Sequence, residues 1–218
     1  MTFWQITAEL LGGFAYTLLI FGVTLAAAIP LGLLVAFGSM SKFKPLSLLI
    51  KGFVWVIRGT PLMLQIIMFA IGPGLWLGIP IRTLGEQLLM VCIAFSINYA
   101  CYFSEIFRGG IESISKGQHE AGQVLGMTKW QVFKHVVLLQ VVKRVIPPMS
   151  NEIITLVKDT ALASVVVHVD LFTIAKQIVN AEVILWPLFY AGLFYLIFSG
   201  ILTVLFGKLE KKLDYFKA

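Results

Sequence analysis

The chain has 218 residues, of which 59% are hydrophobic and 13% charged, and its formal net charge is +6. Soluble domains carry roughly 45–50% apolar and about 25% charged residues, so this chain has too few polar residues to cover a soluble fold. Its mean hydropathy of +0.92 agrees. The composition excludes a disordered chain, a nucleic-acid-binding module and an ordinary cytosolic enzyme. It predicts an all-α integral membrane protein.

Charge-poor runs predict five transmembrane helices in a single domain, residues 1–218. Each run holds about 20 apolar residues, the length that crosses the hydrocarbon core. The fourth is the least apolar, because it carries two basic residues, Glu152 and a predicted helix break at Pro147-Pro148. It should therefore face protein or a water-filled cavity. The expected spans are 10–38, 46–72, 84–107, 136–157 and 184–207.

Basic residues orient these spans. Thirteen of the 17 Lys and Arg residues, Lys217 included, lie in or beside the connections after the first and third spans and in the C-terminal tail. The positive-inside rule makes that side cytoplasmic, which predicts the N-terminus outside and the C-terminus cytoplasmic. Residues 108–135 are then a cytoplasmic connection, and 159–182 are a helix at the outer interface or buried against the bundle. Residues 1–8 lack Lys and Arg, so no signal peptide is expected.

Catalytic motifs are not found in the sequence. His119-Glu120 begins like an H-E-x-x-H zinc site, but position 123 is Gln. The chain has neither a G-x-x-x-x-G-K-[ST] phosphate loop nor a G-x-S-x-G elbow. Cys92 and Cys101 share one apolar segment and are expected to be packing residues. The chain is therefore expected not to be an enzyme, and not to hydrolyse ATP itself.

Residues 118–128 predict a short cytoplasmic helix that Gly126 ends. Ala121 and Gly122 have almost no side chain, so a partner surface can approach them closely. An apolar ridge follows them and suits a groove in that partner. The alternative is a surface helix that rests on the membrane interface. The candidate partner-binding residues are Glu120, Ala121, Gly122, Val124, Leu125, Gly126 and Met127.

This segment resembles the E-A-A…G cytoplasmic signature of the membrane subunits of binding-protein-dependent ABC importers, with Gly122 in place of the second Ala. Three stretches are similar to the polar amino-acid importers of that family: RGTPLMLQ (58–65), SEIFRGGIESISKGQHEA (104–121) and PPMSNEIITLVKDTALASV (147–165). One stretch departs from it. A Leu-Pro-Gln-Ala run is usual where this chain has Leu-Leu-Gln-Val (138–141). We expect the missing proline to straighten the start of the fourth span.

The resemblance implies a type I importer permease fold and an amino-acid transport subunit of a bacterial-type inner (plasma) membrane. Its partners would be a second permease subunit (a second copy or a paralogue), two cytoplasmic ATPase subunits and an external amino-acid-binding protein. The ATPases would bind ATP and magnesium and clasp the coupling helix at 118–128, so this chain needs no cofactor or metal. ATP binding would turn the spans from inward-open to outward-open. A channel or secondary carrier without ATPases is the alternative.

A zwitterionic amino acid needs an anion site and a cation site in a desolvated pocket, and ionisable residues inside spans are candidates for both. Arg58 precedes Gly59 and Pro61, which should loosen the helix, and it suits a carboxylate. The alternatives are a structural pair with an acidic residue or a side chain that reaches the cytoplasmic interface.

On the fourth span, Glu152 is the candidate for the α-amino group or for the side chain of a basic amino acid. The alternative is an ion pair of Glu152 with Arg58 or Lys158. Asn98 could line the same cavity or join two helices by a hydrogen bond. The candidate substrate-binding residues are Arg58, Thr60, Gln65, Ser96, Asn98, Asn151, Glu152, Thr155 and Asp159.

Overall fold

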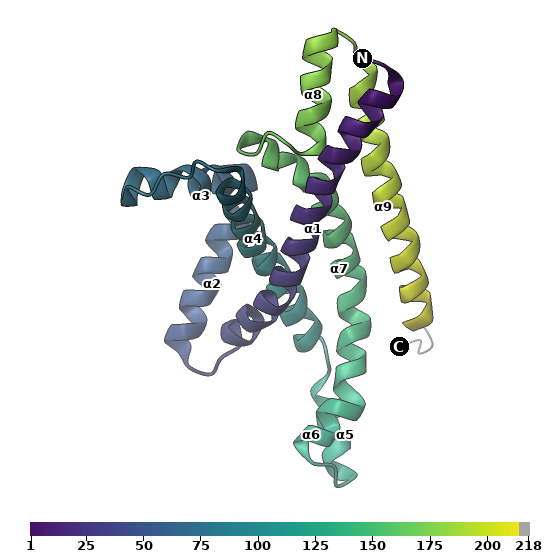
Figure 1. Ribbon diagram of the computed structural model, residues 1–218. Helices are drawn as coiled ribbons and strands as arrows, with labels where there is room; N and C mark the ends of the chain where they lie inside the picture. Colours follow the sequence, from purple (N-terminus) through teal and green to yellow (C-terminus); the bar gives the residue numbers. More distant parts are fainter. Residues whose placement is uncertain (214–218) are drawn as a thin grey trace.

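The computed structural model describes residues 1–213, and the helices that it contains are arranged as a tall bundle with two projecting parts (Figure 1). Lys217, one of the basic residues used above for orientation, lies outside the described residues. A π-helical turn (Phe133–Val137) and a 3-10 helix (Thr160–Val165) flank α7. The α-helices are α1 (Phe3–Ser39), α2 (Lys44–Gly59), α3 (Leu62–Leu77), α4 (Leu84–Glu112), α5 (Lys116–Val124), α6 (Lys129–Val132), α7 (Leu138–Asp159), α8 (Leu171–Glu182) and α9 (Trp186–Leu213).

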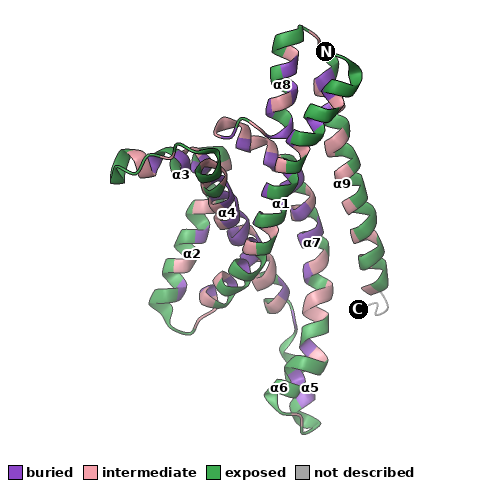
Figure 2. Ribbon diagram, in the orientation of Figure 1, coloured by how far each residue is buried: buried purple, intermediate pink, exposed green. Residues whose placement is uncertain are grey.

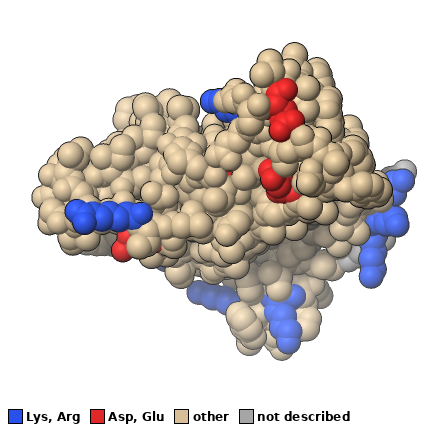
Figure 3. Space-filling model, turned by 45° about the horizontal axis from the view of Figure 1, so that its top comes forward, with Lys and Arg blue, Asp and Glu red and all other residues tan. Residues whose placement is uncertain are grey.

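Within residues 1–213, three helices are long and apolar enough to cross a membrane: α1, α4 and α9. They correspond to the predicted spans 10–38, 84–107 and 184–207. Figure 3 shows a large uncharged surface with most Lys and Arg side chains at its edges, as expected of a chain in contact with lipid. The 22-residue α7 is not among these helices, and five of its residues are charged.

The predicted span 46–72 is wrong as a single helix. The chain forms two helices there, α2 and α3, which are bent by 104° relative to each other. Thr60 adopts an extended conformation (φ −115°, ψ 145°), and Pro61 is the N-cap of the next helix. Proline disfavours the helical conformation of the residue before it and has no N–H to donate. The pair α2–α3 is thus either a broken span or a re-entrant segment, and the break at Thr60-Pro61 faces α4.

The break expected at Pro147-Pro148 is also wrong, because α7 is one continuous helix from Leu138 to Asp159. Two backbone hydrogen bonds are lost to the prolines, but Val145, Met149 and Ile153 hold this part of the helix against the central core. The hydroxyl of Ser150 donates to the Ile146 carbonyl (2.8 Å). Burial against neighbouring helices is what allows proline inside such a helix.

The core is centred on α4, the most buried long helix in Figure 2. α1 crosses it closely at Gly32, where a Cβ would lie 2.9 Å from Phe103 Cβ and 3.0 Å from the Ala100 carbonyl oxygen. Cys92 and Cys101 are both buried in α4 and free, as expected of packing residues.

The segment 159–182 packs against the bundle, one of the two placements expected for it. Leu171 and Ala175 of α8 are buried in a small core with Ile6 and Leu10 of α1. Asp170 caps this helix by accepting hydrogen bonds from the backbone N–H groups of Phe172 (3.1 Å) and Thr173 (3.3 Å).

Candidate functional site

The break between α2 and α3 is closed by the side chain of Gln65. A helix that ends leaves its last carbonyl groups without partners, and Gln65 Nε2 donates to two carbonyl oxygens there, of Ile57 (2.8 Å) and Thr60 (3.2 Å), and to the Thr60 hydroxyl (2.8 Å). Its Oε1 accepts a hydrogen bond from Asn98 Nδ2 of α4 (3.0 Å). Gln65 and Asn98 thereby fix the broken helix to α4.

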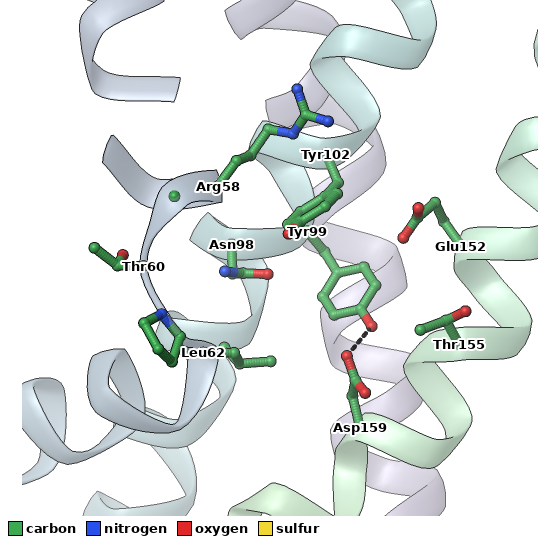
Figure 4. A pocket seen from close by; sticks show the side chains of 11 residues that line it. Arg58, Thr60, Leu62, Asn98, Tyr99, Tyr102, Glu152, Thr155 and Asp159 are labelled. Atoms are coloured by element: carbon green, nitrogen blue, oxygen red, sulfur yellow. Dashed lines mark hydrogen bonds between the residues drawn. The ribbon is translucent and has the colours of Figure 1, made fainter. Parts of the chain in front are cut away.

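A cavity of about 450 Å³ opens beside this break, within the ~300–1,000 Å³ range of small-molecule pockets. The end of α2 and the α2–α3 break form one wall, α4 forms the back and α7 forms the opposite wall (Figure 4). The residues that line the cavity are Arg58, Gly59, Thr60, Pro61, Leu62, Asn98, Tyr99, Tyr102, Glu152, Thr155 and Asp159.

Arg58 stands on the α2 side of the cavity and is directed toward α4. Its guanidinium lies over the ring of Tyr102, with Cζ 5.0 Å from the ring centroid, a cation–π distance. The acidic residue nearest to it is Glu105, at 3.8 Å. Neither of the proposed ion pairs of Glu152, with Arg58 or with Lys158, forms among the described residues. The arginine is thus loosely held and half exposed to the cavity.

The α7 wall carries the acidic groups. Tyr99 donates a hydrogen bond to Asp159 Oδ2 (2.7 Å), and Glu152 lies one helical turn from Thr155 on the same face (Figure 4). The cavity therefore has one guanidinium on one side and two carboxylates on the other. Such an arrangement can bind a carboxylate and a cation of the same small molecule.

Of the nine predicted substrate residues, six line this cavity. Gln65 is buried behind the break, Ser96 is buried in α4, and Asn151 is exposed outside the cavity. Sequence reasoning missed Tyr99 and Tyr102. Tyr102 lies four positions after Asn98 and three after Tyr99, spacings that put side chains on neighbouring parts of a helix surface; that spacing was the available signal, and it does not distinguish a lining residue from a packing residue.

The connection between α4 and α7 is a hairpin, residues 116–132, that projects from the end of the bundle (Figure 1). Its first helix starts at Lys116, earlier than expected. Gly126 follows the end of the helix with φ +75°, a left-handed conformation that favours glycine. The helix end at this glycine is as expected.

Inside the hairpin, the small residue Gly122 has a different use from the one expected. A Cβ there would lie 2.5 Å from Val132 Cγ2, so its small size allows α5 and α6 to pack together. Met127 packs against the same small core. Val124 and Leu125 are 87% and 78% exposed, so they are the ridge residues that remain free to contact a partner.

Known transport proteins are similar to this chain in sequence and in structure. The L-cystine transport system permease protein TcyB of Bacillus subtilis is 36% identical over 100% of this chain and 90% of its own length. The arginine transport system permease protein ArtQ of the same organism is 36% identical over 94% and 92%. A chain from the crystal structure of an amino acid ABC transporter with histidines superposes with a TM-score of 0.85 at 28% identity, over 95% of both chains.

A chain of the inward-facing MetNI methionine ABC transporter shares the fold at 15% identity, with a TM-score of 0.71 over 98% of this chain and 100% of that one. A family model named binding-protein-dependent transport system inner membrane component matches residues 28–215. The match covers most of the sequence. The protein is a transport subunit and not an enzyme, and it belongs to the family of inner membrane components of binding-protein-dependent transport systems.

Proposed function

We propose that this chain is the permease of an ATP-driven importer of basic amino acids, and that the substrate binds in the cavity between the α2–α3 break, α4 and α7. The observation that carries the proposal is the charge of the cavity lining: Arg58 opposes Glu152 and Asp159, so one positive and two negative groups leave one uncompensated negative charge. A basic amino acid has one net positive charge and complements it. The names of relatives, arginine permeases among them, support this class of substrate.

Each group of the substrate has a partner of the right sign. Arg58 binds the α-carboxylate, for which a guanidinium provides two parallel donors. Glu152 and Asp159 bind the two cationic groups, the α-amino group and the side chain. Thr60, Thr155 and Asn98 supply neutral hydrogen bonds around them. The ring of Tyr102 supports the Arg58 guanidinium from one side.

The hairpin 116–132 is the docking element for the ATPases. Each of two cytoplasmic ATPase subunits, with ATP and magnesium bound, grips the exposed Val124 and Leu125 of one permease. Two permease subunits form the translocation path, and a binding protein delivers the amino acid from outside. A carrier without ATPases has no use for a projecting hairpin that exposes apolar side chains.

This assembly lies in the bacterial inner membrane, and five segments cross it: α1, the α2–α3 pair, α4, α7 and α9. The N-terminus is outside and the C-terminus cytoplasmic. The positions of the N-terminus and of the end of α9 support this topology, since the N-terminus lies at the end of the bundle opposite the hairpin and α9 ends toward the hairpin side (Figure 1). Lys208, Lys211 and Lys212 of α9 lie at that end.

Direct binding to the purified permease–ATPase complex tests the proposal. Calorimetry with L-arginine, L-glutamine and L-cystine should detect arginine as the tightest ligand of the wild-type protein. Glu152→Gln should weaken arginine binding about tenfold, the effect of one charged hydrogen bond. Glu9→Gln, an exposed acid on α1, is the matched control and should bind as the wild type does. Binding of glutamine in preference to arginine would refute the assignment to basic substrates.

The same experiment shows which group of the substrate Glu152 binds. If its carboxylate binds the α-amino group, Glu152→Gln weakens the binding of every amino acid that the site accepts. If it binds the cationic side chain, only the binding of basic amino acids is weakened. For the hairpin, Leu125→Asp should abolish transport into proteoliposomes and leave arginine affinity unchanged, because Leu125 is exposed and does not line the cavity.

A further inference from the structure

Beyond the cavity, α4 carries a row of alternating charges on one face: Glu105, Arg108 and Glu112. Arg108 holds both carboxylate oxygens of Glu105, through Nε to Oε1 (3.1 Å) and NH2 to Oε2 (2.5 Å). Its remaining terminal nitrogen, NH1, donates to Glu112 Oε2 (2.7 Å). None of the three lines the cavity. Arg108 is thus fully engaged with the carboxylates of its own helix.

This arrangement determines how strongly Arg58 is held. Arg58 NH1 lies 3.8 Å from Glu105 Oε2, which is beyond hydrogen-bond distance. Paired charges at ideal distance lie about 2.7–2.9 Å apart, so a movement of about 1 Å would bring Arg58 into a full ion pair with Glu105. What opposes that movement is that Arg108 already donates to both oxygens of this carboxylate and offsets its charge, which weakens its attraction for a second guanidinium. Arg58 remains stacked on Tyr102 at the edge of the cavity.

We propose that Arg108 and Glu105 are positioning residues that control the affinity of the substrate carboxylate for Arg58. With Arg108 in place, the carboxylate of Glu105 is largely neutralised, and Arg58 is free to turn to the substrate. Without Arg108, Glu105 captures Arg58 in a bidentate pair and competes with the substrate for it. The inference rests on the proposed function, in which Arg58 binds the substrate carboxylate.

The competition predicts an unusual pattern of single and double variants. Arg108→Gln should weaken L-arginine binding to the purified permease–ATPase complex about tenfold, because binding must first break the new Arg58–Glu105 pair. Glu105→Gln removes the competitor and should bind L-arginine at least as tightly as the wild type. In the double variant, removal of the competitor should restore the affinity lost in Arg108→Gln to within about twofold of Glu105→Gln.

A purely structural role of this cluster would give a different result. If Arg108 only stabilised α4, Glu105→Gln would remove the same interaction, and both single variants and the double variant would bind weakly. That outcome overturns the inference. Arg82→Gln is the matched control for loss of an arginine, because Arg82 is exposed and lies outside this cluster; it should bind L-arginine normally.

A ligand without a carboxylate gives an independent readout. L-argininamide retains both cationic groups but has no carboxylate for Arg58 to bind. Arg108→Gln should therefore leave the dissociation constant of L-argininamide unchanged and weaken the binding of L-arginine. Equal losses for the two ligands would overturn the inference. Failure of the proposed function is distinguishable: there the wild type binds no basic amino acid, or Arg58→Gln binds L-arginine as tightly as the wild type.

Discussion

The hydroxyl of Tyr99 donates a hydrogen bond to Asp159 Oδ2 across a distance of 2.7 Å. The two residues are 60 positions apart, and their contact joins the middle of α4 to the end of α7 beside the cavity. Tyr99 is 2% exposed, so the bond is largely shielded from water. The same carboxylate is therefore both part of the cavity lining and a structural link between two of its walls.

Removal of that hydroxyl should destabilise the fold. Tyr99→Phe keeps the ring in the core but deprives Asp159 of its donor, which should cost about 1–3 kcal/mol, the range for leaving a buried hydrogen-bonding group without its partner. Thermal unfolding of the purified protein in detergent measures the loss. Tyr16→Phe, a tyrosine of α1, is the control. An unchanged melting temperature in Tyr99→Phe would mean that the bond contributes nothing to stability.

The contact of α1 with α4 predicts opposite effects for two glycines of one helix. Gly32→Ala places a methyl group within 3.0 Å of the Phe103 Cβ and the Ala100 carbonyl oxygen, neither of which can move independently of α4. Overpacking of this kind costs about 1–3 kcal/mol. A Cβ at Gly22 would meet nothing within 4 Å, so Gly22→Ala should be neutral or stabilising by up to about 1 kcal/mol. Similar melting temperatures for the two variants would contradict the packing.

The packing inside the hairpin predicts that a second substitution restores the activity lost by a first one. Gly122→Ala creates an overlap with Val132 Cγ2, 2.5 Å from the new Cβ, and should separate α5 from α6 and lower transport-coupled ATP hydrolysis. Val132→Ala removes the overlapping methyl groups, so the double variant should recover much of that activity. Gly117→Ala has no neighbour closer than 4.0 Å and serves as the control. If the double variant is worse than Gly122→Ala, Val132 is not the obstacle.

The burial of the Asp170 carboxyl predicts an effect of pH on the stability of the fold. Its side chain is fully buried at the start of α8, and desolvation raises the pKa of the carboxyl above its usual value although hydrogen bonds from Thr173 oppose the change. The folded state then binds the proton more tightly than the unfolded state. Stability should therefore fall as the pH rises from the unfolded pKa of about 3.9 through the folded pKa.

Two variants separate the charge of Asp170 from its capping role. Asp170→Asn keeps an oxygen that can accept from the first turn of α8 and should remove this dependence on pH. Asp170→Ala removes the cap as well and should be about 1–2 kcal/mol less stable than Asp170→Asn at any pH. Melting temperatures across the acidic range provide the measurement. A wild-type stability that rises with pH in a manner abolished by Asp170→Asn would reverse the predicted sign.

Local sequence predicted the helices better than it predicted their continuity. The charge-free runs that became α1, α4 and α9 were predicted well, because an apolar run of about 20 residues has few alternatives in a membrane. The two proline sites were predicted poorly. At Pro61 the helix turns by 104°, whereas α7 continues through Pro147-Pro148. The difference lies in the neighbours: Gln65 provides substitute donors at the first site, and core packing supports the second.

The candidate site also contains some residues that the sequence could predict and others that it could not. Arg58, Glu152 and Asp159 could be predicted because a charge inside an apolar segment is costly and calls for a function. Tyr99 and Tyr102 could not, since an aromatic residue in an apolar helix fits a core or a lipid-facing position equally well. Nor could the sequence distinguish Gly122 as a packing residue from a partner contact, because both uses require a small side chain.

By itself, the sequence determined that the protein is helical and lies in a membrane, and its motifs indicated the transporter family. Composition is sufficient to indicate a membrane protein, because a surface made mostly of apolar residues needs an apolar environment. Only the tertiary structure decided that Arg58 lies near Glu105 and not Glu152, and that two carboxylates face it across one cavity. The physical reason is the break at Thr60-Pro61: its direction is set by contacts with α4, from residues more than 30 positions away in the chain.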